Sequence, residues 1–254
     1  MISLVKRTIA LIITNSLFGI IISRIFSGHI PNNGNKIDVN YDVISNSTKA
    51  KIFFNIYEGA EIKFLKKYFE KGYDVIELGS SIGVVSCLIK SLMDAKNKLV
   101  CVEASPKLLK ILNKNLVINQ LQNNSNVLNA AITAQKDSKQ IFFNPGMSNT
   151  TGIISKKRKS QDSTKIKSKT INEILNDFNF DKYIMVMDIE GAEIDILLSN
   201  NTRFKNCKLL FIELHRIKHD GVFYNVDDMI NILIDKYHFS LLDRNDNVCV
   251  FNKI

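Results

Sequence analysis

"DVIELGSSIGVVSC", residues Asp74–Cys87, places an acidic residue and two glycines between two apolar runs. The run before Gly79 predicts a buried strand, and the run after Gly83 predicts a helix that begins at once. Gly79 can adopt a positive φ and leaves no Cβ between the backbone and a ligand, while Gly83 lets the helix begin close to the sheet. Glu77, near the end of the strand, is expected to direct its carboxylate into the same crevice. We therefore predict a ligand-binding turn here.

Apolar strand-like runs alternate with helical stretches along most of the chain. The predicted strands are Tyr73–Leu78, Lys98–Glu103, Asn126–Ile132, Tyr183–Asp188 and Lys208–Glu213. The predicted helices are Gly83–Met93, Pro106–Asn119, Thr170–Asp177 and Glu193–Leu198. Near the C-terminus, "FSLLDRNDNVCVFNK" predicts two strands joined by a turn. This order predicts an α/β fold with a mostly parallel, doubly wound sheet and an antiparallel C-terminal hairpin.

The spacing of the glycine turn indicates which ligand it binds. A dinucleotide-binding turn has a glycine at the middle position, where this chain has Ser81, after Ser80. The observed order, acid-x-G-x-x-x-G, is instead the one associated with S-adenosylmethionine, whose ammonium group suits a nearby acid. Glu103, at the end of the next strand, can accept hydrogen bonds from both ribose hydroxyls. Because NAD sites also have a carboxylate there, Glu103 indicates a nucleoside without distinguishing the two cofactors.

Five segments, "DVIELGSSIGVVSC", "CVEASPKLLKILNKNL", "NVLNAAI", "MVMDIEGAEIDIL" and "LLFIELH", occur in this order. Together they resemble the FkbM-type family of S-adenosylmethionine-dependent methyltransferases, from about Tyr57 to about Leu242. The resemblance implies a Rossmann-like class I methyltransferase fold and O-methylation of a hydroxyl, commonly on a saccharide or other natural product. The chain departs from the family's usual D-x-G-A-N-x-G turn at Glu77 and at Ser80-Ser81, so we expect altered contacts to the cofactor.

The same resemblance assigns further residues to the cofactor. It places Ala104 and Ser105 beside the adenosine, and Ala130 and Ala131 at the border of the adenine, where small side chains leave room for a flat ring. Tyr57-Glu58 matches the family's Y-E and is expected to close over the cofactor, with a surface turn as the alternative.

Acidic residues and a histidine follow the fourth and fifth predicted strands, where the acceptor would lie. His215 and Asp188 are the two candidates for the general base that removes the hydroxyl proton. Glu190 lies two residues after Asp188, and like-charge repulsion between their carboxyls raises the pKa of one of them. A structural hydrogen bond at the strand end is an equally good explanation of His215. With Glu213 these residues could also bind a divalent metal, an interpretation that we do not favour.

The segment "NPGMSNTTGII", Asn144–Ile154, is rich in hydroxyls and turn formers. Ser148, Asn149 and Thr150 are candidates for binding a small-molecule or glycan acceptor, together with His215, although a plain connecting loop explains the segment equally well. The basic run Lys156–Lys159 follows directly and would admit an anionic acceptor, but a solvated charge run is the simpler explanation.

The composition is that of a globular protein with a basic surface. The chain has 254 residues, 45% of them hydrophobic, and a formal net charge of +9. Four scattered cysteines, Cys87, Cys101, Cys207 and Cys249, indicate buried thiols in the reducing cytoplasm. The charge allows a nucleic-acid methyltransferase as an alternative, but the chain lacks the N/D-P-P-[YF] motif of many such enzymes, so a nucleic-acid partner is disfavoured. A non-catalytic binding module is the alternative outside enzymes, and the oligomeric state is left open.

The N-terminal segment is apolar enough to need a separate interpretation. We divide the chain into an apolar helix and linker, residues 1–35, and a methyltransferase domain, residues 36–254. "TIALIITNSLFGIIIS", Thr8–Ser23, is shorter than the roughly 20 residues of a membrane span. A packed or partner-binding helix is the preferred interpretation, a membrane-surface contact flanked by Lys6, Arg7 and Arg24 is second, and a span is third. Gly28–Lys36 predicts a linker or a tight loop.

Overall fold

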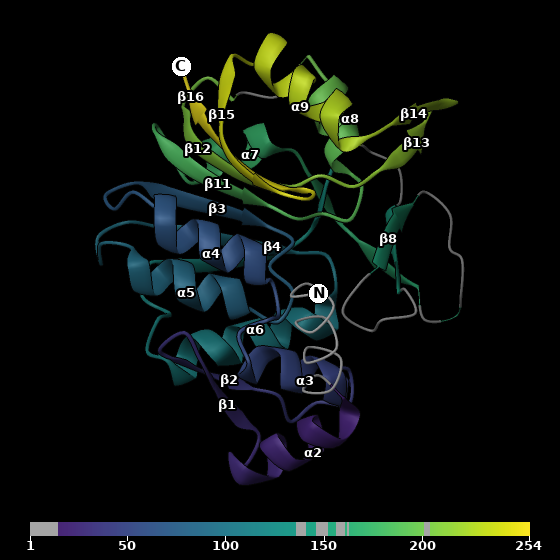
Figure 1. Cartoon of the computed structure of the whole chain (residues 1–254). Helices are drawn as coiled ribbons and strands as arrows, with labels where there is room; N and C mark the ends of the chain where they lie inside the picture. The colour runs from purple at the N-terminus through teal and green to yellow at the C-terminus, as the bar shows by residue number, and fades with distance from the viewer. Residues whose placement is uncertain (1–14, 136–140, 146–151, 156–160, 162, 201–203) are drawn as a thin grey trace, which may run out of the picture.

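A computed structural model describes residues 15–135, 141–145, 152–155, 161, 163–200 and 204–254. A seven-stranded sheet runs through its centre (Figure 1). Its strands are β3 (Asp74–Leu78), β4 (Leu99–Glu103), β5 (Ser125–Asn129), β11 (Tyr183–Met187), β12 (Cys207–Glu213), β15 (Phe239–Asn245) and β16 (Val248–Lys253). They lie in the order β15-β16-β12-β11-β3-β4-β5.

The five strands from β12 to β5 are parallel, and β16 and β15 extend the sheet with antiparallel pairing. The chain lays down β3, β4 and β5 in one direction across the sheet and then returns to place β11 beside β3. The strand order therefore reverses between β3 and β11, which is where open α/β sheets bind ligands. The predicted parallel sheet and C-terminal hairpin are confirmed.

Helices cover both faces of the sheet, which explains why the inner strands β4 and β11 are buried on both sides (Figure 1). One face packs on α4 (Gly59–Tyr68), α5 (Val84–Leu92) and α6 (Pro106–Ile118), and the other on α7 (Ile171–Asp177), α8 (Glu193–Leu198) and α9 (Val226–Asp235). Along β3 the side chains alternate between the two layers: Val75 belongs to the first apolar cluster and Ile76 to the second. All four cysteines are free and buried, as predicted.

The N-terminal region adds α2 (Ser16–Ile25), β1 (His29–Asn32), β2 (Asn35–Asp38) and α3 (Asn46–Phe53). Of the two interpretations of Gly28–Lys36, the linker is wrong, because β1 and β2 pair as an antiparallel hairpin, and the tight loop is the turn of this hairpin, Asn33-Gly34, which has positive φ at both residues. Ile30 and Ile37 of this hairpin are buried in the same cluster as α4 to α6. The division of the chain at residue 35 stays a prediction. Within the described residues, no helix has both the length and the hydrophobicity that crossing a bilayer requires.

Three small sheets flank the central one. They are formed by β6 (Ala131–Ile132) with β10 (Ser168–Lys169), by β7 (Ile141–Pro145) with β8 (Gly152–Ser155) and β9 (Thr164–Ile166), and by β13 (Ile217–His219) with β14 (Val222–Tyr224). The predicted strand Asn126–Ile132 is therefore two strands in different sheets. The predicted loop Asn144–Ile154 includes the end of β7 and the start of β8.

Candidate active site

A cavity lies at the carboxyl ends of β3, β4 and β11, where the strand order reverses. Its volume is about 1310 Å³, including the part that is open to solvent. Most of the predicted site residues line it: Glu77, Gly79, Ser80, Ser81, Glu103, Ala104, Ala130, Ala131, Asp188 and Glu190. Gly83, Ser105 and His215 are described but are not part of the lining.

The glycine turn brings β3 into direct contact with the chain that leaves β11. Gly79 has a φ of +88°, and a Cβ on it would lie 1.7 Å from the carbonyl oxygen of Asp188. The N–H groups of Gly79 and Ser80 both donate to the carbonyl of Val102 on β4, at 2.9 and 3.1 Å. The turn is therefore held against two neighbouring strands, and only glycine fits its first position.

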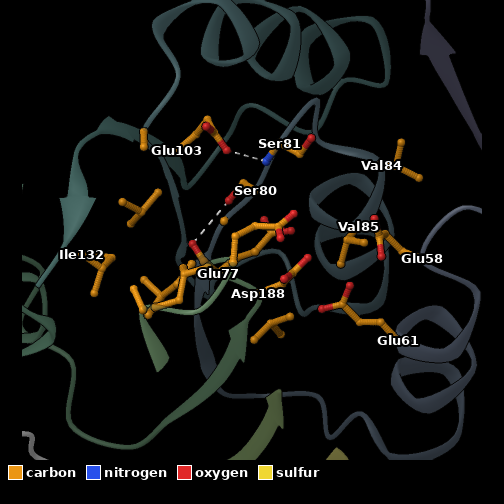
Figure 2. A pocket seen from close by; sticks show the side chains of 18 of the residues that line it. Glu58, Glu61, Glu77, Ser80, Ser81, Val84, Val85, Glu103, Ile132 and Asp188 are labelled. Atoms are coloured by element: carbon orange, nitrogen blue, oxygen red, sulfur yellow. Dashed lines mark hydrogen bonds between the residues drawn. The ribbon is translucent and has the colours of Figure 1, made fainter. Parts of the chain in front are cut away.

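Ser81 occupies the position that a dinucleotide-binding turn gives to glycine. Its φ is +46°, in the left-handed region, so the chain keeps the conformation of that position with a residue that adopts it less readily. The Ser81 N–H donates to Oε2 of Glu103 at 2.8 Å (Figure 2), and its hydroxyl lies 3.4 Å from the Tyr57 hydroxyl. The bond to Glu103 uses the backbone and does not depend on the side chain, so the contact that the serine itself adds is the one with Tyr57.

Glu103 is held in place by the backbone. Oε2 accepts from Ser81, and Oε1 accepts from the N–H of Ser105 at 2.6 Å, so each oxygen already has one donor. Burial raises the pKa of this carboxyl, which is 7% exposed, and the backbone hydrogen bonds oppose that rise. A carboxylate oxygen can accept more than one hydrogen bond, so Glu103 still has capacity for ligand hydroxyls. Ser105 therefore positions Glu103 and does not itself border the cavity.

Glu77 lies deeper than the sequence suggested. Its side chain follows Val75 onto the α5 face of β3, where its carboxylate accepts from the hydroxyl of Ser86 on α5. Burial raises its pKa to about 7. Gly83 lies at the start of α5 with a φ of +84°, and a Cβ there would approach Leu112 to 3.1 Å. Glu77 and Gly83 therefore join α5 to its neighbours, and Glu77 borders the cavity as well.

One end of the cavity is apolar. Ala130 and Ala131, at the start of β6, line it together with Ile132 and Phe143, and all four side chains are buried. The carbonyl of Ala104 accepts from Asn129, which connects the ends of β4 and β5. Small side chains backed by larger apolar ones form a slot that suits a flat ring.

The other end is acidic. Figure 2 shows the carboxylates of Glu58, Glu61 and Asp188 gathered on one side of the cavity. Burial and mutual repulsion raise the pKa of Glu58 to about 7 and hold those of Glu61 and Asp188 well above their ordinary values. Among the described residues, the lining contains one cationic side chain, Lys51. This end of the cavity is therefore suited to a positively charged or hydroxylated ligand.

His215 lies beside the acidic end in a ring of carboxylates. Its Nδ1 is 3.2 Å from Oε1 of Glu193, and its Nε2 lies 3.6 Å from Glu190, 3.7 Å from Glu213 and 3.9 Å from Asp188. Burial alone would lower its pKa, but the hydrogen bond to Glu193 and the other carboxylates raise it to about 9. The predicted candidates for acceptor chemistry are thus brought together.

In the part of the chain that the structure describes, two groups of side chains have the geometry for a metal ion: Asp188, Glu193 and His215, and Glu58, Asp188 and Glu213. Neither matches the predicted set of Asp188, Glu190, Glu213 and His215. Acidic groups often gather without an ion, so a metal site stays a prediction that we do not favour. The predicted acceptor-binding residues Ser148, Asn149 and Thr150, and the basic run Lys156–Lys159, lie outside the described residues.

Comparison with known proteins identifies the family. The model of the methyltransferase FkbM domain matches residues 59–241, which is most of the chain. The chain belongs to the FkbM family of S-adenosylmethionine-dependent methyltransferases. This FkbM match begins at Gly59, the first residue of α4, so α2, β1, β2 and α3 precede it. The predicted Rossmann-like class I methyltransferase fold is the fold of this family, and methyl transfer is its reaction.

Solved structures match the chain at low identity and low TM-score. A precorrin-6y C5,15-methyltransferase from Geobacter metallireducens has 11% identity and a TM-score of 0.44, over 78% of this chain and 87% of its own. Fibrillarin from Aeropyrum pernix, bound to S-adenosyl-L-methionine, has 11% identity and a TM-score of 0.42, over 77% and 74%. A protein of the NADB-Rossmann superfamily from Streptococcus agalactiae has 13% identity and a TM-score of 0.43, over 76% and 67%. Among curated proteins, the comparison found no match.

The sequence analysis of this FkbM chain missed two acids of the site. Glu61 lies one helical turn after Glu58 and lines the cavity, and that spacing could have identified it. Glu193 was read only as the start of a helix. An acidic residue is ordinary in the first turn of a helix, so no sequence signal marked the burial of its side chain, which is 0% exposed.

Proposed function

We propose that this chain transfers a methyl group from S-adenosylmethionine to a hydroxyl oxygen of a small molecule, with a saccharide or the glycan of a glycolipid as the acceptor class. Family membership accounts for the methyl transfer. The observation that carries the choice of oxygen is the His215–Glu193 pair beside the acidic end of the cavity.

The cavity residues fit the cofactor. Gly79 leaves the turn without a Cβ, Glu103 offers oxygens to the ribose hydroxyls, and Ala130 and Ala131 border the slot for the adenine. The acidic end opposes the positive charge of the ammonium and sulfonium groups. When bound, S-adenosylmethionine supplies an electrophilic methyl group. What the chain must add is positioning of the acceptor oxygen and removal of its proton.

His215 is the better candidate for the base because Glu193 orients it. Glu193 Oε1 accepts from the Nδ1–H of the ring, and it also accepts from the N–H of Ile189 at 3.0 Å. The proton on Nδ1 leaves Nε2 with the lone pair, facing Asp188 and the cavity side. Nε2 takes the hydroxyl proton as the new bond to oxygen forms. Because the pKa of His215 in the free enzyme is about 9, we expect kcat/KM to rise with pH up to that value.

The charge of the acidic end favours a neutral acceptor over an anionic one. Glu58, Glu61 and Glu190 line the cavity, and Lys51 is the cation among the lining residues. Carboxylates accept hydrogen bonds from sugar hydroxyls but repel phosphates. The same repulsion disfavours a nucleic-acid substrate at this opening.

Mass spectrometry across a panel of saccharides and glycolipids tests the proposal by the mass gain of one methyl group. We expect a product with the wild type and a loss of about 10²- to 10⁴-fold in rate with His215→Asn. His219→Asn is the matched control, because His219 also has a carboxylate 3.0 Å from Nδ1, in Asp195, but lies on β13 outside the cavity lining. Equal losses in the two variants would contradict the assignment of the base. Failure of the wild type to bind S-adenosylmethionine in calorimetry would contradict the proposed enzyme and leave the non-catalytic binding module as the remaining function.

A further inference from the structure

Helix α2 presents an apolar face that no described residue covers. Leu17, Ile21 and Ile25 are 62%, 44% and 69% exposed, and Phe18 beside them is 38% exposed. Positions 17, 21 and 25 follow one another at intervals of four, so these side chains lie in a row along one side of the helix. Single exposed apolar residues are ordinary, but a row along a whole short helix indicates a partner.

This face is held rigidly because the other side of α2 is packed closely. Gly19 is buried, and a Cβ on it would lie 1.7 Å from the carbonyl oxygen of Asn46 at the start of α3. Ile22, on the buried side of α2, belongs to the large apolar cluster under the sheet. Asn15 caps the helix by accepting from the N–H of Leu17. The exposed row therefore belongs to a helix that is fixed to the body of the protein.

The charges near α2 indicate what kind of surface this face meets. Arg24 lies on α2 itself, and α3, which packs on α2, adds Lys49 and Lys51, while the acids of residues 15–56 are two aspartates. One aspartate, Asp38, is buried and paired with Lys114 at 2.5 Å, which leaves Asp42 as the exposed acid of this region. Two copies of such a face would repel one another, whereas an anionic surface would attract it.

We infer that α2 lays its exposed apolar row on an anionic lipid bilayer. The combination of an apolar face with surrounding cations is that of a helix that lies in the membrane interface, and a helix of ten residues is too short to cross the bilayer. Each basic residue near such a surface strengthens binding by about fivefold. The docking needs only α2 and the neighbouring cations, and it is independent of methyl transfer.

The position of α3 relates this surface to the cavity. Helix α3 packs on α2, as Figure 1 shows, and its residues Thr48 and Lys51 line the cavity. A bilayer on the exposed row would lie on the side of α2 away from α3, so α3 stands between the bilayer and the cavity. The docking therefore makes no claim about the acceptor.

Vesicle flotation of the full chain tests the docking. We expect binding to phosphatidylcholine vesicles that contain about 30% phosphatidylglycerol, weaker binding to phosphatidylcholine alone, and weakening by salt. The triple variant L17Q/I21Q/I25Q loses three partly inserted side chains at about fivefold each and should bind about 100-fold more weakly. The control V222Q/F223Q removes two exposed apolar side chains from β14, 55% and 60% exposed, and should bind as the wild type does.

Three outcomes would overturn the inference. One is a wild type that does not float with anionic vesicles, as expected where another segment of the chain covers the face. The second is a triple variant that binds as well as the wild type while its thermal unfolding is unchanged. The third is a dimer in sedimentation without lipid that the triple variant dissociates, since that result would assign the face to a second copy. None of these outcomes bears on cofactor binding in calorimetry, which tests the proposed function separately.

Discussion

Replacing Glu77 by glutamine should make the protein more stable at alkaline pH. Glu77 is 2% exposed and accepts from the Ser86 hydroxyl, and glutamine keeps both the shape and one acceptor oxygen. What the substitution removes is the charge. Because the site is buried, that charge is unfavourable in the folded protein.

The size of the effect follows from the pKa of Glu77, which burial raises from the ordinary 4.5 to about 7. Between these values the folded protein keeps a proton that the unfolded chain has released, so the free energy of unfolding falls as pH rises. At about 1.4 kcal/mol per pH unit, the loss is about 3 kcal/mol and is complete above about pH 7. Replacing one carboxylate oxygen by an amide nitrogen costs about 1 kcal/mol in lost hydrogen bonding. Glu77→Gln should therefore be about 1 kcal/mol less stable than the wild type at about pH 4.5 and about 2 kcal/mol more stable at about pH 8.

Urea unfolding followed by circular dichroism at both pH values measures this difference. The comparison with the wild type cancels the other groups that titrate in the same range. A difference in unfolding free energy that does not change with pH would refute the reasoning, because it would mean that Glu77 is ionised in the folded protein at no cost.

Three further predictions concern the cavity. Gly79→Ala should abolish cofactor binding in calorimetry and lower the melting temperature, because its methyl group would overlap the carbonyl of Asp188, and unchanged binding would contradict the described turn. Glu103→Gln should weaken S-adenosylmethionine binding by about tenfold to 100-fold through the loss of charge-assisted hydrogen bonds. Equal affinity would contradict the proposal that Glu103 binds the ribose hydroxyls. Glu193→Gln should shift the pH-rate profile to lower pH, because the pKa of His215 falls without its carboxylate partner, and a lower rate with an unshifted profile would make Glu193 merely structural.

Sequence patterns predicted those parts of the fold that depend on neighbours along the chain. The helix Glu193–Leu198 has the predicted bounds, and β3 begins one residue after its predicted start. The predicted strand Asn126–Ile132 was wrong as one element because Ala131 and Ile132 pair with residues 168–169, a partner that no local pattern reveals. For the same reason the sequence predicted a linker or a tight loop at Gly28–Lys36 and missed the paired strands around the turn: their isoleucines become core residues only where α4 to α6 cover them.

For the site, the sequence by itself determined the glycine turn, Glu103 and the family, because a strand, a tight turn and a helix are local features with local requirements on φ and side-chain size. Tertiary structure decided the rest. Only the pairing of β11 with β12 brings Glu193 against His215, and only the packing of α4 against the sheet adds Glu61 to the cavity wall. The pKa values that control the chemistry arise from that proximity and from burial, because a charge responds to every group around it in space and not to its position in the chain.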